Sequence, residues 1–301
     1  MVDKIGIFWF RQDLRLSDNR ALNELIKNCD KIIPVYILDD RFDLGGASKW
    51  WLYQSLDKLK ESLIIKNSQL YFFKGSPKKI LIKLLKNYKA KYIYWNRLYD
   101  QYAVKRDLDI KKKLKQENIN VASFNGSLIN EPWTIKNKSE SFFKVFTPYW
   151  NSCLENIQSI KLIKAPKKIN TLSLKANDSL LLDDLRLFHK NSKWIKVLSS
   201  HWVPGEIQAL KNFNNFKNNI INNYENGRNR PDKNYTSKLS PYLHFGEISP
   251  EKIFFEIQNK NTINHQSKKK YLSEIGWREF SYNLLYYYPK IRVEPIQGKF
   301  K

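Results

Sequence analysis

The sequence is poor in the residues that disulfide scaffolds and metal sites require. Its 301 residues include two cysteines and four histidines. Cys29 and Cys153 lie far apart, with no second thiol or histidine near either of them at the spacing of metal ligands. This pattern argues against a disulfide framework and against a zinc site. It favours a protein of the reducing cytoplasm, with no metal.

Long apolar runs are also missing. A transmembrane helix needs about 18 or more consecutive apolar residues, and the first apolar run, residues 5–10, ends at Arg11. The sequence therefore predicts neither a membrane span nor a signal peptide, and we expect a soluble protein.

Glycine is scarce, and the ten glycines do not form the familiar phosphate-binding fingerprints. Neither G-x-G-x-x-G nor G-x-x-x-x-G-K-[ST] occurs. The pair Gly45–Gly46 has the chemistry of a turn. These absences argue against nicotinamide binding and against Walker-type nucleotide binding.

Acidic residues are few beside the basic ones: 29 Asp and Glu stand against 53 Lys and Arg, a net charge of +24. The excess is spread over the chain, with +11 in residues 1–127, +4 in 128–192 and +9 in 193–301. Charge alone fits a lysine-rich soluble surface or a polyanionic partner. Because 14% of the residues are aromatic, and bases stack on rings, we favour nucleic acid as the partner.

Residues 1–127 alternate short β-type segments with helical patterns. Five segments are too short for helices and rich in β-branched and aromatic residues: 5–10, 32–38, 70–73, 92–95 and 119–124. Helical spacing lies between them in 52–63, 76–88 and 102–117. Such alternation predicts an α/β domain with a doubly wound, parallel, Rossmann-like sheet of five strands.

The remaining chain loses this alternation. Residues 128–200 have no clear period and predict an interdomain linker. Residues 201–301 show helical spacing in 204–224, 250–258 and 268–288, with no convincing strand. We expect the first part of an all-helical domain there.

Seven segments resemble, in order, the photolyase/cryptochrome family. They are 9–19 (WFRQDLRLSDN), 46–52 (GASKWWL), 131–133 (EPW), 145–150 (VFTPYW), 202–206 (WVPGE), 236–250 (TSKLSPYLHFGEISP) and 274–280 (EIGWREF). We refer to them as the family segments. The last one most resembles class I cyclobutane pyrimidine dimer photolyases. Collinear matches along the chain are far more specific than any single motif.

The resemblance implies a deoxyribodipyrimidine photo-lyase, a carbon–carbon lyase that repairs DNA. In that family, photoexcited reduced FAD passes an electron to a pyrimidine dimer and the dimer splits. The helical domain binds FAD and the damaged DNA. Two alternatives stay open: a cryptochrome-like blue-light photoreceptor, or a partial photolyase that binds DNA without repair. A third is a nucleotide-binding α/β protein whose helical tail only packs against it.

The stretch 236–240 is the predicted cofactor loop. Its hydroxyls and backbone N–H groups precede a helix that Pro241 can start, which suits a pyrophosphate as well as an ordinary helix cap. Its place in the family segments favours the cofactor. The resemblance implies flavin contacts from Tyr224, Thr236, Ser237, Lys238, Leu239, Ser240, Tyr271 and Arg278.

Glu274, Trp277 and Arg278 share one helix face because they are spaced i, i+3 and i+4. Alone, this spacing predicts a Glu274–Arg278 ion pair beside a core tryptophan. The resemblance implies instead that Glu274 and Trp277 are the catalytic residues and contact the flipped dimer, while Arg278 faces the flavin. It further implies that Arg228 contacts a DNA phosphate.

The chain ends about one helix after the last family segment, where the family has several more helices. We therefore expect a truncated or split chain, doubtful in activity alone, a monomer if complete or completed by a second chain. A second, light-harvesting chromophore of folate or deazaflavin type is possible in the α/β domain. Tyr102 and Ala103 stand where folate-binding members often have polar contacts, which disfavours folate.

Overall fold

The computed structural model describes residues 3–41, 43–157, 160–175, 177–189 and 192–296. Residues 1–2, 42, 158–159, 176, 190–191 and 297–301 of the predicted domains and linker lie outside the described residues.

Five parallel strands form the sheet, in the order β3-β2-β1-β4-β5. The strands are β1 (Ile5–Phe10), β2 (Lys31–Leu38), β3 (Tyr71–Lys74), β4 (Tyr92–Asn96) and β5 (Asn120–Phe124). Each matches a predicted segment within about one residue. The doubly wound α/β fold is therefore confirmed.

Four helices cover the two faces of this sheet. Side chains of α1 (Arg20–Asn28) and α2 (Gly46–Ile65) share one buried cluster with one face, and those of α3 (Pro77–Asn87) and α4 (Gln101–Gln116) share another with the opposite face. The prediction missed α1. The sequence does contain a start signal for this helix, because asparagine is a favoured N-cap residue. In the structure the Asn19 side chain accepts the Leu22 N–H.

The segment predicted as a linker contains more structure than expected. It holds α5 (Phe146–Glu155), α6 (Trp194–His201) and the short 3₁₀ turns η1 (Pro132–Thr134) and η2 (Leu182–Leu185). α5 buries Tyr149 and Trp150, and it packs on α11 (His265–Tyr287). Packing on α11 stabilises this short helix. It can therefore form although its own sequence has only a weak helical pattern.

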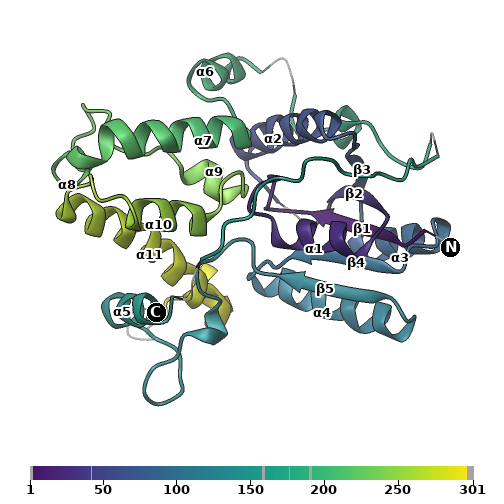
Figure 1. Ribbon diagram of the computed structural model, residues 1–301, viewed down its shortest axis with the longest axis horizontal. Helices are drawn as coiled ribbons and strands as arrows, with labels where there is room; N and C mark the ends of the chain where they lie inside the picture. The colour runs from purple at the N-terminus through teal and green to yellow at the C-terminus, as the bar shows by residue number, and fades with distance from the viewer. Residues whose placement is uncertain (1–2, 42, 158–159, 176, 190–191, 297–301) are drawn as a thin grey trace.

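Helices dominate the rest of the chain. They are α7 (Glu206–Asn215), η3 (Phe216–Ile220, a π turn), η4 (Ile221–Asn223), α8 (Tyr224–Gly227), α9 (Ser240–His244), α10 (Pro250–Gln258), α11 and η5 (Pro289–Arg292). Figure 1 shows α7 to α11 gathered on one side of the molecule and the sheet with α2 to α4 on the other. The described residues beyond 205 contain no strand. No described helix is long and apolar enough to cross a membrane.

Buried carboxylates of the helical part hold the two parts together. Glu247 is fully buried and accepts hydrogen bonds from Trp51 Nε1 (2.9 Å), Ser55 Oγ (2.6 Å) and the Gly205 N–H (2.5 Å). Trp51 and Ser55 belong to α2 of the α/β part. A buried charge is tolerated only when it is well hydrogen-bonded, so this carboxylate fixes where α2 lies against the helical part.

Glu206, the half-buried first residue of α7, makes a second contact between the two parts. It accepts the N–H groups of Leu16 (2.7 Å) and Ser17 (2.9 Å), and also the Ser17 hydroxyl. Residues 16 and 17 lie in the loop that follows β1. The helical part thereby orders the loop at the carboxyl end of a central strand.

A third carboxylate, that of Glu279, should make the free energy of unfolding depend on pH. Glu279 of α11 is buried and accepts the N–H groups of Ile129 (2.7 Å) and Asn130 (3.3 Å), and burial raises its pKa to about 7. An unfolded glutamate has a pKa of about 4.3. Between these values the folded chain holds an extra proton at Glu279, so the contribution of this group to the free energy of unfolding falls as pH rises, by up to ~1.4 kcal/mol per pH unit. Glu247 and Glu251, whose pKa burial also raises to about 7, add to the slope of the parent chain. Urea titrations from pH 5 to 7.5 measure this slope.

Glu279→Gln keeps an oxygen acceptor for both N–H groups and removes the titration. We expect its slope to be flatter than that of the parent chain. Glu24→Gln, on the outer side of α1, is the control and should leave the slope unchanged. Equal slopes in the parent and Glu279→Gln would contradict the prediction.

Candidate functional site

Helix α11 carries four of the predicted site residues, Tyr271, Glu274, Trp277 and Arg278. It begins where the Asn264 side chain accepts the Ser267 N–H (2.8 Å), and it runs 23 residues to Tyr287, shortly before Pro289. Its length lets one face pack against α5 while other side chains reach α8 and the segment near residue 127.

The structure brings Glu274 together with Arg228. Their side chains form an ion pair in which both are about a quarter to a third exposed, and the guanidinium carbon lies 5.8 Å from the centre of the Tyr224 ring. Hydrogen bonding to Glu274 raises the pKa of Arg228. The Glu274–Arg278 pair that spacing alone predicts does not form among the described residues.

Two predicted flavin contacts, Tyr224 and Tyr271, pack together next to this pair. Tyr224 and Tyr271 are buried, with ring centres 5.1 Å apart, and both contact Phe216. The Tyr271 hydroxyl is buried and has no hydrogen-bond partner among the described residues. The Ser237 side chain lies next to it outside hydrogen-bond geometry. An unsatisfied buried hydroxyl costs free energy, so this position suits a missing polar partner.

The predicted cofactor loop approaches this cluster through a tight turn. A Cβ added to Gly227 would lie 2.2 Å from the Tyr235 ring, so only glycine lets the loop fold back here. Lys238 has a left-handed φ of 53°, and Leu239 anchors the loop in the core. Within the described chain, the N–H groups of 236–239 have no hydrogen-bond acceptor.

Free N–H groups in such a turn suit an anionic oxygen. The loop is half or fully exposed at Thr236, Ser237, Lys238 and Ser240, so a ligand could reach it. The helix that follows, α9, has only five residues, and the loop itself would therefore supply most of the donors.

Arg278 contacts a different part of the chain from Glu274 and Tyr271. Its guanidinium donates to the Ser127 carbonyl (2.8 Å), pairs with Glu279 (3.1 Å) and lies 4.8 Å from the Tyr282 ring centre. These contacts join α11 to the segment that follows β5. Its predicted flavin contact stays a prediction.

Trp277 is not the core ring that spacing alone suggests. It is 46% exposed, and one turn separates it from the ion-paired Glu274. One face of the indole stacks on Phe146, with ring centres 3.8 Å apart and planes 9° from parallel. A large ring that remains half open can accept a further flat group.

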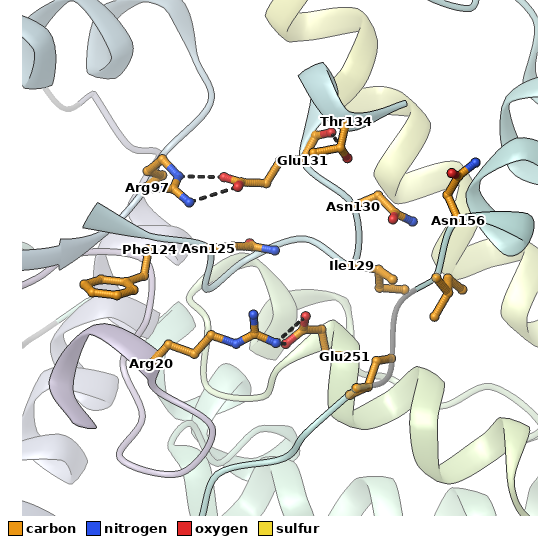
Figure 2. A pocket seen from close by; sticks show the side chains of 12 residues that line it. Arg20, Arg97, Phe124, Asn125, Ile129, Asn130, Glu131, Thr134, Asn156 and Glu251 are labelled. Carbon is orange, nitrogen blue, oxygen red and sulfur yellow. Dashed lines mark hydrogen bonds and ion pairs between the residues drawn. The ribbon is translucent and has the colours of Figure 1, made fainter. Parts of the chain in front are cut away.

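A cavity of about 350 Å³ at the junction of the two parts was not predicted. Figure 2 shows two ion pairs facing it, Arg97 with Glu131 and Arg20 with Glu251. The side-chain nitrogen of the buried Asn130 has no hydrogen-bond partner in the described part of the chain. Glu131 and Glu251 lie in or beside family segments, but those matches could not reveal that the two pairs share one cavity.

A second cavity, of about 360 Å³, lies at the carboxyl end of β4. Trp95, Lys111 and the half-exposed Trp133 line it, and Trp95 Nε1 is buried with no hydrogen-bond partner among the described residues. Burial lowers the pKa of Lys111. Such rings beside cations suit a flat, anionic ligand.

Tyr102 and Ala103 lie at the start of α4. The Tyr102 hydroxyl donates to Asp39 (2.8 Å) and Ala103 is buried. Neither is among the residues that line the second cavity.

Sequence comparison gives consistent matches. The family model described as DNA photolyase matches residues 6–168. The deoxyribodipyrimidine photo-lyase of Agrobacterium fabrum is 36% identical over 95% of this chain and 60% of its own length. Cryptochrome-2 of Arabidopsis thaliana is 32% identical over 96% of this chain and 50% of its own. The chain thus spans about half to three-fifths of the length of these relatives.

Solved structures agree with the fold. A bacterial class III photolyase from Agrobacterium tumefaciens covers the whole chain with a TM-score of 0.95 and 34% identity, over 62% of its own length. A Synechocystis cryptochrome covers 96% of the chain and 62% of its own length, with a TM-score of 0.83 and 24% identity. The latter likeness concerns the fold alone.

Tyr271→Phe tests the unsatisfied hydroxyl. Removing a buried hydroxyl without a partner should leave the free energy of unfolding unchanged or raise it by about 1 kcal/mol. Tyr242→Phe is the matched control, because its buried hydroxyl donates to the Val203 carbonyl (2.9 Å) and accepts from Asn212 (3.1 Å). It should lower the free energy of unfolding by about 1 kcal/mol. Urea unfolding measures both, and an equal loss in the two variants would refute the assignment.

Proposed function

Because this chain belongs to the DNA photolyase family, which includes cryptochromes, we propose that it binds FAD and DNA containing pyrimidine dimers and takes part in light-driven splitting of those dimers. The observation that carries the proposal is the arrangement on α11. There an exposed stacking ring, Trp277, lies one turn from an arginine–carboxylate pair. Tyr271 of the same helix lies beside Ser237 of the cofactor loop, whose N–H groups are free within the described chain.

The residues present fit part of a flavin site. The N–H groups of 236–239 can hold the pyrophosphate oxygens, and the unpartnered Tyr271 hydroxyl can hydrogen-bond to the ligand. Tyr224 stabilises Tyr271 by an edge-to-face contact. When bound, reduced FAD supplies the electron that opens the dimer after absorbing light.

The basic surface and the ring have different tasks on DNA. The net charge of +24 attracts phosphates without regard to sequence. A dimer has impaired stacking and pairing, so flipping it out costs less than flipping sound bases. Trp277 offers an open ring for the flipped pair, which gives selectivity for damage.

Arg228 and Glu274 act as a pair. A guanidinium has five N–H donors, so Arg228 can keep its bond to Glu274 and still donate to a phosphate. This holds the Glu274 carboxyl in place beside Trp277. An ion-paired carboxylate has no proton to share, so Glu274 must first take up a proton from solvent and release Arg228. Its carboxyl can then donate to a carbonyl oxygen of the damaged base once that base carries negative charge.

The cavity of about 360 Å³ at β4 is our candidate for a second chromophore. It offers a half-exposed tryptophan, a cation and an unpartnered Trp95 N–H. The choice between a folate and a deazaflavin stays open, and the resemblance to class I photolyases stays a prediction.

A cryptochrome-like photoreceptor is the second candidate function. It is favoured by the identity of 32% with a plant cryptochrome over nearly the whole chain. The two candidates share the flavin and differ in the fate of the dimer.

We expect the chain, extended to the length of its photolyase relatives and supplied with reduced FAD, to remove dimers from ultraviolet-irradiated oligothymidylate under blue light. Recovery of absorbance at the thymine band measures this loss, and a dark sample is the control. Dimer-selective binding with no loss of dimers in light would favour the photoreceptor or a DNA-binding partial photolyase. Absence of both flavin binding and dimer selectivity would refute the proposal.

Trp277→Ala should separate selectivity from general affinity. Stacking on a ring contributes about 1–3 kcal/mol per base, so we expect affinity for dimer-containing DNA to fall roughly ten- to a hundredfold. Affinity for undamaged DNA should hardly change. Fluorescence anisotropy of labelled duplexes, with and without a dimer, measures both.

Arg228→Gln is the contrasting variant. Losing one phosphate contact should weaken both duplexes about equally and reduce the salt slope by roughly one. A loss confined to the damaged duplex would instead assign Arg228 to the lesion pocket.

A further inference from the structure

Trp277 is fixed on one side only. Its ring stacks on Phe146 and meets Phe280 edge-on, with centres 6.0 Å apart. No other ring contact of Trp277 occurs among the described residues. Nearly half of its surface remains accessible, so the indole has a covered face and an open one.

Phe146 is held by the packing of α5 on α11. It is the first residue of α5, and it shares a helix face with Tyr149 and Trp150, three and four residues on. The Tyr149 ring centre lies 5.2 Å from that of Phe280. A Cβ added to Gly276 would lie 2.5 Å from the Trp150 indole. The helices are therefore in close contact just where Phe146 meets Trp277.

This packing decides which face of the indole a ligand can use. The face on Phe146 is continuous with the buried cluster between α5 and α11, so it is closed to a base. An exposed tryptophan without such a support would sample several rotamers. Immobilising a side chain on binding costs about 0.5–1.5 kcal/mol, and a supported ring avoids that cost.

We propose that Phe146 is a positioning residue for damage recognition: it holds the Trp277 ring so that the open face is ready to stack on the flipped dimer. This inference rests on the proposed function of Trp277. It assigns a role to the segment between the two domains, which otherwise carries none of the predicted site residues.

Phe146→Leu removes the flat support and keeps an apolar side chain. We expect affinity for dimer-containing duplex to fall roughly three- to tenfold, with unchanged affinity for undamaged duplex and an unchanged salt slope. Phe146→Tyr keeps the ring and should bind as the parent chain does. Phe142→Leu is the matched control, since Phe142 stacks on Tyr287 of the same helix, with centres 4.7 Å apart and planes 13° from parallel.

A double-mutant cycle distinguishes positioning from general destabilisation. In a Trp277→Ala background, Phe146→Leu should have no further effect on dimer affinity, because the ring that it supports is gone. Additive losses would overturn the proposal. If Phe146→Leu does not fold, Phe146→Met takes its place in the cycle.

The remaining outcomes are equally distinct. If Trp277→Ala abolishes selectivity and Phe146→Leu does not change it, the positioning role is wrong and the proposed function stands. If Phe146→Leu raises dimer affinity, Phe146 occupies the face that the base needs, which also overturns the inference. If the parent chain shows no dimer selectivity, the proposed function itself fails.

Discussion

The two halves of the molecule are held in register by buried and half-buried carboxylates that accept hydrogen bonds across the junction. These are the half-buried Glu206 of α7, the buried Glu247 in the turn between α9 and α10, and the buried Glu279 of α11. Each accepts N–H or O–H groups of the preceding chain. Arg15 makes the reverse contact and donates to the Gly246 carbonyl (2.9 Å) from the loop after β1. Each group is too costly to bury alone. The domains must therefore dock in one geometry, and the position of α11 relative to the sheet follows from it.

That docking explains why one helix can carry several tasks. α11 presents Glu279 and Arg278 to the segment near residues 127–130, and Trp277 to α5. Glu274 and Tyr271 face α8. A helix turns 100° per residue, so neighbouring positions serve different partners. Loss of the Glu279 contact would therefore disturb the open face of Trp277 as well as the domain junction.

The fold was predictable from sequence because strand alternation is a local signal, and all five strands lie where short β-branched and aromatic runs predicted them. α5 was missed because its stability comes from contacts with α11, more than a hundred residues later in the chain. Within the site, spacing correctly placed Glu274 near Trp277 on one helix. It could not show that Glu274 pairs with Arg228, since that contact depends on how α8 packs. Phe146 and the junction cavity were invisible for the same reason.

In the function that we propose, charge and stacking divide the work of recognition. Fifty-three basic residues would attract any DNA, and a free carboxylate at the binding face would oppose that attraction. Pairing Glu274 with Arg228 removes most of this repulsion, yet keeps a carboxyl beside the ring. Selectivity must then come from a contact that salt does not screen, and a supported aromatic face is such a contact. The affinity of this chain for DNA should accordingly depend on ionic strength, while its preference for damaged DNA should not.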